Sequence, residues 1–284
     1  MKQLFKSKYP IVCSPMNGVS DSKLAIACAQ AGIVPSLFLH PFTNLNDFSK
    51  SVTEVLAHCS NIHVSSSLKD ITTNAELIKK LGITHIEILE FENNDLSLDN
   101  KTIINDLRSS GIKVILKILL THVIDQFIDI IDAVTIKGSK GAGRSAKDIK
   151  LEDAILDIKS KYPSLKIIAS GGVKNKSDID SLLALGACAV SIGTLFAMSK
   201  ESPIPDAVKD KLLQSTSDDI RRLKMGARQR AIVFDEQSND DFNNTQGLYS
   251  GLQTGLTGHI FIGNAIDSVT GMLSVQEIVD HLVS

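Results

Sequence analysis

Short apolar runs alternate with amphipathic stretches along most of the chain. The apolar runs are rich in isoleucine and valine, as expected of strands buried on both faces of a parallel sheet. The stretches between them carry apolar side chains at helical spacing, as do Phe48, Val52 and Val55. Strands are predicted at residues 11–15, 33–39, 62–66, 85–89, 112–119, 132–136, 165–170 and 187–192. Helices are predicted at residues 24–32, 44–57, 73–81, 101–107, 122–128 and 151–159, and around Ile179–Leu183.

This alternation predicts an α/β fold in which eight strand–helix repeats close into a (β/α)8 TIM barrel. A closed barrel is favoured over an open doubly wound sheet because the repeats are similar in length and no long structureless loop interrupts them. The chain has 284 residues, which suits one barrel with an insertion. We therefore expect residues 1–284 to form a single domain.

The pattern changes after Phe196. Residues 199–258 hold several helix-like pieces, a basic cluster and a polar, acidic loop. We expect a mainly helical cap at the carboxyl end of the barrel, because so few large apolar groups would hardly stabilise a separate domain. A last helix at 274–283 would close the outer ring. We interpret the basic cluster as a solvated helix face rather than a binding patch; it consists of Arg221, Arg222, Lys224, Arg228 and Arg230.

Three glycine-rich turns follow predicted strands. Residues 171–172 follow the seventh strand, residues 193–194 follow the eighth, and a loop at 137–144 with three glycines and flanking cations follows the sixth. In a β/α barrel these turns leave the same face, where the loops after strands seven and eight direct free amides at a phosphate. The turns therefore favour an anion or cofactor site over a mobile loop.

Composition narrows the functional classes mainly by exclusion. The net charge of -2, the absence of tryptophan and the aromatic content of 5% give no general attraction to nucleic acid and no stacking platform for single strands. No apolar run is long enough to span a membrane and no signal segment begins the chain, so a cytoplasmic protein is expected. Without CxxC spacing, the cysteines are expected to be buried free thiols and no metal site is predicted: Cys13, Cys28, Cys59 and Cys188.

Two strands carry further candidate residues. The sequence Pro15-Met16-Asn17-Gly18 combines a soft side chain with a glycine, which suits the close approach of a flat ring but is a weak signal alone. Lys117 interrupts the apolar run 114–119. As a structural residue it would leave a charge in apolar surroundings, so a functional role is favoured.

Five segments together resemble the nitronate monooxygenase family, formerly called 2-nitropropane dioxygenases, which also contains the flavin-dependent enoyl-ACP reductases of bacterial fatty-acid synthesis. They include PIVCSPMNGVS at 10–20, IASGGV at 168–173 and LGACAVSIGTLF at 185–196. The other two are the helix 24–32 and the loop 137–144, and the resemblance extends from residue 10 to about 201. The family is a β/α barrel that binds one FMN, so the resemblance implies FMN as the cofactor.

The resemblance also implies roles for single residues. Met16, Asn17 and Gly18 would lie against the isoalloxazine ring, and Ser65, or its neighbour Ser66, would bond the flavin. The remaining implied cofactor contacts are Lys117 at the N1 and O2 edge of the ring, Gly138 and Gly143 through their backbone, Gly172, Gly193 and Thr194 at the phosphate, and Ser191 and Ile192 on the strand beneath it.

The chain departs from the family at one position that matters for catalysis. The family's loop usually ends in Ala-Gly-Gly-His, with the histidine as catalytic base or substrate contact, but here it reads Gly141-Ala142-Gly143-Arg144. Arginine stays protonated at ordinary pH and cannot act as a general base, although it can hold an anion bidentately. His40, just past the second strand, is the first substitute to consider, followed by His122 and His259.

The expected function is that of an FMN-dependent oxidoreductase of nitronate monooxygenase type, with Arg144 steering a small anionic substrate. Two alternatives are an enoyl thioester reductase that uses NAD(P)H, and an FMN-binding protein that has lost catalysis with the histidine. A sugar-phosphate barrel with Lys117 as catalytic lysine is a further alternative. The sequence does not fix the oligomeric state, although barrels of this kind commonly form homodimers.

Overall fold

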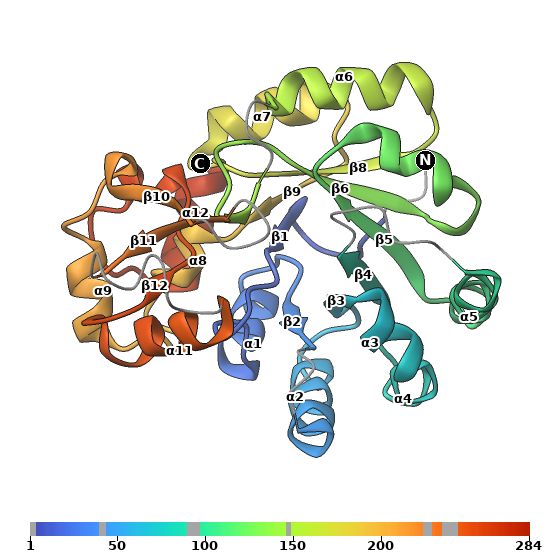
Figure 1. The fold of residues 1–284 in the computed structure, drawn as a ribbon, viewed down its shortest axis with the longest axis horizontal. Helices are drawn as coiled ribbons and strands as arrows, with labels where there is room; N and C mark the ends of the chain where they lie inside the picture. The colour runs from blue at the N-terminus through green and yellow to red at the C-terminus, as the bar shows by residue number, and fades with distance from the viewer. Residues whose placement is uncertain (1–3, 40–43, 90–96, 146–148, 224–228, 235–243) are drawn as a thin grey trace.

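The computed structural model of the chain describes residues 4–39, 44–89, 97–145, 149–223, 229–234 and 244–284. Eight parallel strands follow one another in the order β1-β9-β8-β6-β5-β4-β3-β2, and a bridge between Val12 and Val34 joins the two ends. Figure 1 shows this barrel with helices around its outside. The predicted TIM barrel is confirmed. Its strands are β1 (Ile11–Cys13), β2 (Ser36–Phe38), β3 (His63–Ser67), β4 (His85–Leu89), β5 (Lys113–Ile118), β6 (Ala133–Lys137), β8 (Lys166–Ser170) and β9 (Ala189–Ile192).

Helices follow the strands as predicted, with two differences. The predicted helix 73–81 corresponds to α4 (Ala75–Lys80), which Asn74 separates from an additional helix, α3 (Leu68–Thr73), that the pattern did not predict. The predicted helix 122–128 is a pair of 3-10 turns, η1 (Thr121–Gln126) and η2 (Ile128–Ile130). The outer helices are α1 (Ser22–Gln30), α2 (Leu45–Leu56), α3 (Leu68–Thr73), α4 (Ala75–Lys80), α5 (Leu98–Ser109), α6 (Leu151–Lys161), α7 (Lys176–Ala184) and α12 (Val275–Val283). Side chains cap several of them; Asp21, for example, accepts from the backbone of Leu24.

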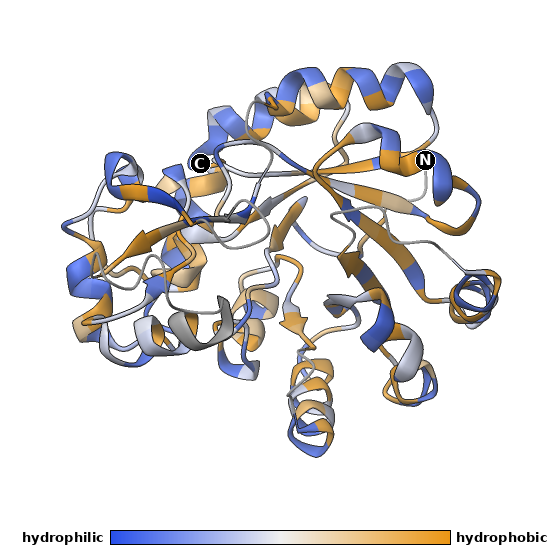
Figure 2. Ribbon diagram, in the orientation of Figure 1, coloured by the Kyte–Doolittle hydropathy of each residue, from blue (hydrophilic) through white to orange (hydrophobic). Residues whose placement is uncertain are grey.

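Two apolar cores stabilise the barrel. The larger one lies between the strands and the outer helices, whose inward faces are orange in Figure 2. The smaller one fills the barrel interior, and Phe5 from the N-terminal segment packs into it and against the ring of His85. The members of the inner core are Leu4, Phe5, Val12, Val34, Ile115, Ala133, Ile168 and Ala189.

The segment after β9 contains helices and also a small antiparallel sheet that the sequence pattern did not predict. The sheet joins β10 (Ile220–Leu223), β11 (Gln229–Val233) and β12 (His259–Ile260), and β11 also pairs with β7 (Gly143–Arg144) of the sixth-strand loop. The cap is thereby attached to that loop. Its helices are α8 (Thr194–Ala197), α9 (Asp206–Leu212) and α11 (Asn244–Thr254), with 3-10 turns η3 (Ser217–Asp219) and η4 (Asn264–Ser268).

The interpretation of the basic cluster as a helix face is wrong. Arg221 and Arg222 are exposed on strand β10, whereas Arg230 on β11 is half-buried. Arg230 donates to the carbonyl oxygens of Ser139 and Gly141 at 2.6 and 3.3 Å. This arginine therefore holds the sixth-strand loop. Lys224 and Arg228 lie outside the described residues.

The four cysteines are free, as predicted, but they differ in burial. Cys13 and Cys28 are buried, Cys59 is half-buried and Cys188 is exposed, so the expectation of burial is wrong for Cys188. Among the helices that the structure describes, none has the length and apolar character needed to cross a membrane.

Candidate active site

The barrel interior changes from apolar to polar within two residues along its strands. Side chains on one face of a strand recur at every second residue. The inner-core residues of the sheet, and also His63 and His85, whose rings face Phe5 at the start of β3 and β4, are therefore each followed by the next inward position. Those next positions are Ser14 and Ser36 after Val12 and Val34, Lys117, Thr135, Ser170 and Ser191 after Ile115, Ala133, Ile168 and Ala189, and Ser65 and Glu87 after His63 and His85. We call these eight residues the polar layer.

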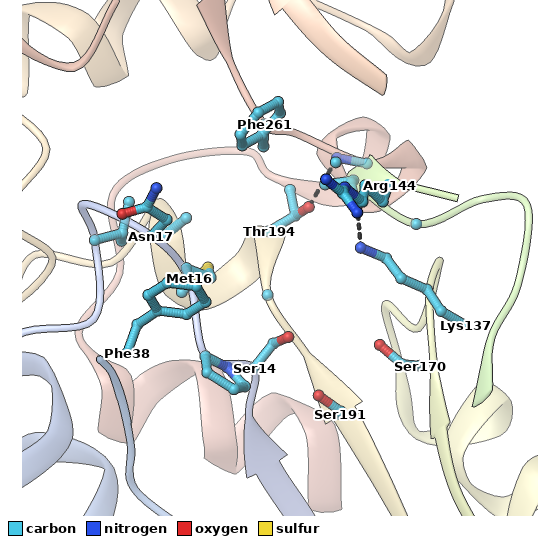
Figure 3. A pocket seen from close by; sticks show the side chains of 18 of the residues that line it. Ser14, Met16, Asn17, Phe38, Lys137, Arg144, Ser170, Ser191, Thr194 and Phe261 are labelled. Carbon is cyan, nitrogen blue, oxygen red and sulfur yellow. Dashed lines mark hydrogen bonds between the residues drawn. The ribbon is translucent and has the colours of Figure 1, made fainter. Parts of the chain in front are cut away.

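A cavity of about 440 Å³ opens beyond the polar layer, at the carboxyl end of the strands. Its wall combines apolar side chains with cations. Figure 3 shows Met16, Asn17 and Phe38 on one side and Lys137 and Arg144 on the other. The volume lies in the range of small-molecule sites, and the position is the one that barrel enzymes use.

Two glycine turns pack so closely that side chains are excluded there. Gly171 has φ +107°, and a Cβ on it would lie 3.1 Å from both the carbonyl oxygen of Gly138 and the amide nitrogen of Gly141. Gly172 has φ +84°, and its Cβ would lie 2.7 Å from Cβ of Lys140. Only glycine adopts these angles without strain. The turn after β8 and the loop after β6 therefore fix each other at the cavity rim.

The hydroxyls beside these turns differ in what they bond. Thr194 Oγ1 accepts from the backbone N–H of Gly263 at 3.0 Å, which ties the start of α8 to the cap. Ser191 Oγ is buried, lines the cavity and has no hydrogen-bond partner among the described residues. Because a buried hydroxyl without a partner costs free energy, Ser191 points to a ligand that supplies one.

A buried ion pair lies under the cavity. Glu87 accepts from Lys117 Nζ and Ser65 Oγ, both at 3.0 Å, and from Thr135 Oγ1 at 2.7 Å. Burial alone would raise the pKa of Glu87, but Lys117, His63 and Thr135 together outweigh burial, and the pKa falls to about 2. Lys117 lines the cavity while paired, so it is held in place and does not face solvent.

Lys137 provides a second cation at the end of β6. It is half-buried, its Nζ donates to the carbonyl oxygen of Ala142, and it forms no ion pair within the described part of the chain. Burial lowers its pKa to about 7, with a further lowering from Lys117. Arg144, on β7, lines the cavity beside it.

The structure brings most of the sequence-predicted site residues to one cavity. The predicted residues that line it are Met16, Asn17, Lys117, Gly143, Arg144, Gly172, Ser191, Ile192, Gly193 and Thr194. Ser66, the neighbour of Ser65, also lines it, while Ser65 lies beneath and donates to Glu87.

Two predicted glycines have packing roles outside the cavity lining. A Cβ on Gly18 would lie 2.5 Å from Leu252 Cδ1 of the cap helix, and one on Gly138 would lie 3.1 Å from Leu151 Cβ at the start of α6. His40 lies outside the described residues. Of the other histidines considered, His122 is exposed on η1 and His259 is buried on β12, where its Nε2 has no partner in the described part of the chain.

Sequence reasoning missed three parts of the site. Glu87 and Thr135 sit at inward positions of apolar strands. The two-residue period that places Lys117 on the inward face of β5 also places Glu87 and Thr135 on the inward faces of β4 and β6. Lys137 was noted only as a cation that flanks the loop, although it continues the inward face of β6 two residues after Thr135. Phe261 enters the cavity from the cap, and no local pattern predicts that contact.

The fold and the site together define a class of protein, the β/α-barrel enzymes with a small-molecule cavity at the carboxyl end of the strands. The sequence profile of the family "Nitronate monooxygenase" matches residues 97–284. The chain belongs to the nitronate monooxygenase family of oxidoreductases.

Known proteins similar to this chain carry different activities. It is 25% identical over 224 residues to a (3aS,4S,5R,7aS)-5-hydroxy-7a-methyl-1-oxo-octahydro-1H-indene-4-carboxyl-CoA dehydrogenase of Mycobacterium tuberculosis, in a match covering 77% of this chain and 61% of that enzyme. FabK from Thermotoga maritima has a TM-score of 0.83 at 19% identity, covering 98% of this chain and 92% of FabK. Nitroalkane oxidase from Streptomyces ansochromogenes has a TM-score of 0.80 at 16% identity, covering 97% and 95%. At such identities the two structures show the shared fold alone.

Proposed function

We propose that the protein is an FMN-dependent oxidoreductase of nitronate monooxygenase type that acts on a small anionic substrate. The observation that carries this proposal is the hydroxyl of Ser191, which is buried in the cavity lining without a partner among the described residues, in a cavity whose rim is built from mutually packed glycine turns. Such a rim offers backbone amides and a free hydroxyl to a phosphate, and the apolar wall beside Met16 suits a flat ring.

The lining residues divide into two groups that match the two ends of FMN. Gly172, Gly193 and Ser191, which all line the cavity, would hold the phosphate with backbone amides and a hydroxyl. Met16 and Asn17 would lie along the ring. Lys117, fixed by Glu87, would place a positive charge near it. A fixed cation stabilises a flavin that carries negative charge after reduction.

FMN, when bound, supplies a redox ring that exchanges electrons or a hydride with the substrate. Arg144 would bind the substrate's anionic group, since a guanidinium forms charge-assisted hydrogen bonds with nitronate or carboxylate oxygens. Phe38 and Phe261 line the same cavity and would exclude water from the reacting atoms.

The reductase alternative also has support. The mycobacterial relative acts, by its name, on a CoA thioester. An enoyl thioester reductase would draw electrons from NAD(P)H. The third alternative, an FMN-binding protein without turnover, rests on the arginine at 144.

The absorption spectrum of the purified protein, with the mass of any released ligand, tests the proposal directly. We expect a yellow protein that releases FMN, and bleaching on anaerobic mixing with a nitronate such as that of nitroethane. Bleaching by NADPH alone would support the reductase, and no bleaching by either would favour the binding protein. A colourless protein that takes up no FMN would contradict the whole assignment.

Replacing Arg144 with alanine separates substrate binding from cofactor binding. We expect Arg144→Ala to raise KM for an anionic substrate by about 10-fold or more, the loss of one charge-assisted hydrogen bond, while FMN stays bound. Arg144→Lys is the matched variant that keeps the charge. Loss of FMN from Arg144→Ala would show that Arg144 is a cofactor ligand instead.

A further inference from the structure

The proposed function leaves open which side chain exchanges a proton with the substrate. Four ionisable side chains line the cavity within the described residues: Asp70, Lys117, Lys137 and Arg144. Asp70 is engaged at the start of α3, where its carboxylate accepts from the hydroxyl of the N-cap residue Ser67 at 2.5 Å and its backbone N–H donates to the same hydroxyl. Lys117 is committed to Glu87, and a guanidinium does not release its proton near neutral pH. Lys137 remains.

The loop around Lys137 is built to admit its side chain. A Cβ on Gly141 would lie 2.7 Å from Lys137 Cε, and one on Gly143 would lie 3.9 Å from Nζ. A side chain at position 141 would therefore crowd the lysine, whereas the distance at position 143 is an ordinary van der Waals contact. The amine therefore reaches across the loop to the carbonyl oxygen of Ala142, at the cavity surface and next to Arg144.

The charges around Lys137 favour its neutral form. Lys117 faces it from β5 and Arg230 from β11, with Arg144 on β7 beside it, and the carboxylate of Glu87 on β4 partly offsets these cations. Burial contributes most, and together these influences lower the pKa of Lys137 to about 7. An amine in this condition exists in both protonation states near neutral pH, which is what proton exchange requires.

We propose that Lys137 is the general base and acid of this cavity, and that its substrate is a carbon acid whose anion Arg144 stabilises. The inference rests on the proposed function for the identity of the substrate. In the step itself, a C–H bond beside the electron-withdrawing group breaks and its electron pair stays on the substrate as a delocalised anion. The proton forms a new N–H bond on Nζ, and the resulting ammonium returns a proton to the carbon or to water.

Exchange of the α-protons of nitroethane in D2O, followed by proton NMR, tests this assignment without any redox turnover. We expect the wild-type protein to accelerate the exchange, with a rate that rises through a midpoint near pH 7. Lys137→Gln is expected to lose at least about 100-fold of the acceleration, the usual contribution of general acid–base catalysis. Lys137→Arg keeps the positive charge but is expected to lose the exchange as well, because arginine stays protonated. Lys80→Gln removes an exposed lysine on α4 and is the matched control.

The assignment would be overturned by a wild-type protein that does not accelerate the exchange, or by a Lys137→Arg variant as active as the wild type. Thermal unfolding of each variant shows whether it is folded, and Lys137→Arg serves if Lys137→Gln is not. FMN binding, measured by quenching of flavin fluorescence, is recorded on the same samples. Exchange without FMN binding would contradict the proposed function but support the role of Lys137 as general base. FMN binding without exchange would support the proposed function but contradict that role.

Discussion

At the scale of single residues, the site depends on polar groups placed two residues beyond an apolar core. The hydroxyl of Ser191 and the carboxylate of Glu87 occupy equivalent inward positions, yet their surroundings differ. Glu87 is fully bonded by neighbouring strands, whereas Ser191 has no partner among the described residues. The first is therefore a structural support, and the second is available to a ligand.

Substitution of Ser191 separates ligand binding from stability. We expect Ser191→Ala to weaken FMN binding by about 10-fold or more, because a hydrogen bond to a charged group is worth about 1.5–3 kcal/mol. The free energy of unfolding of the FMN-free protein should not fall, since the hydroxyl loses no partner within the described chain. Fluorescence titration with FMN and urea unfolding measure the two quantities. A large loss of stability would show that the hydroxyl is bonded within the protein.

Removal of the charge on Glu87 is expected to lower the free energy of unfolding, which Ser191→Ala should leave unchanged. Glu87→Gln leaves the ammonium of Lys117 buried without its carboxylate, so the free energy of unfolding should fall by about 3 kcal/mol or more. Lys117→Met in the same chain should recover part of this loss, because the uncompensated charge is then gone. Urea unfolding of the two variants provides the measurement. As a control, breaking the exposed pair of Lys176 and Asp180 by Lys176→Ala should change little.

At the scale of elements, the repeating part of the chain could be predicted and the small sheet of the cap could not. Most barrel strands are largely apolar runs, and most outer helices carry an apolar face and a capping side chain, so local sequence identifies them. Strands β10 and β11 have no such signal: β10 shows two exposed arginines in a row, and β11 is held by distant partners, including Gly143 and Arg144. The role of Arg230 depends on the same long-range pairing, which explains why its helix assignment failed.

The packing of helix α11 on strand β12 depends on one glycine. A Cβ on Gly251 would overlap the carbonyl oxygen of His259 and lie 2.9 Å from its amide nitrogen. Gly251→Ala should therefore separate the helix from the strand at a cost of about 1–3 kcal/mol. Hydrogen exchange should become faster in residues 248–262 and stay unchanged in the barrel strands. Gly271→Ala is the control, because no described residue has an atom within 4 Å of its Cβ; equal exchange in the two variants would contradict the expected separation.

At the scale of the whole molecule, the two ends of the barrel have different chemistry. The carboxyl end holds the cavity, whereas the N-terminal segment closes the amino end, where Phe5 packs on His85 with ring centroids 4.5 Å apart and His85 Nε2 lies 2.9 Å from the carbonyl oxygen of Leu4. His63 also begins a strand at this end and is buried. Two buried imidazoles therefore lie at the amino end.

Because these two imidazoles are buried, the free energy of unfolding is expected to fall in mild acid. Burial lowers the pKa of His63 and of His85 to about 4, below the value of about 6.5 in an unfolded chain. Between these values the unfolded state binds more protons, so the contribution of these histidines to the free energy of unfolding is fully present above about pH 6.5 and falls toward pH 4. Each histidine contributes up to about 1.4 kcal/mol per pH unit. Urea unfolding from pH 7.5 to 4 measures the slope, and His85→Gln should reduce it, whereas His122→Gln removes an exposed histidine and should leave it unchanged. A slope that His85→Gln does not alter would show that the amino end tolerates a charged imidazole.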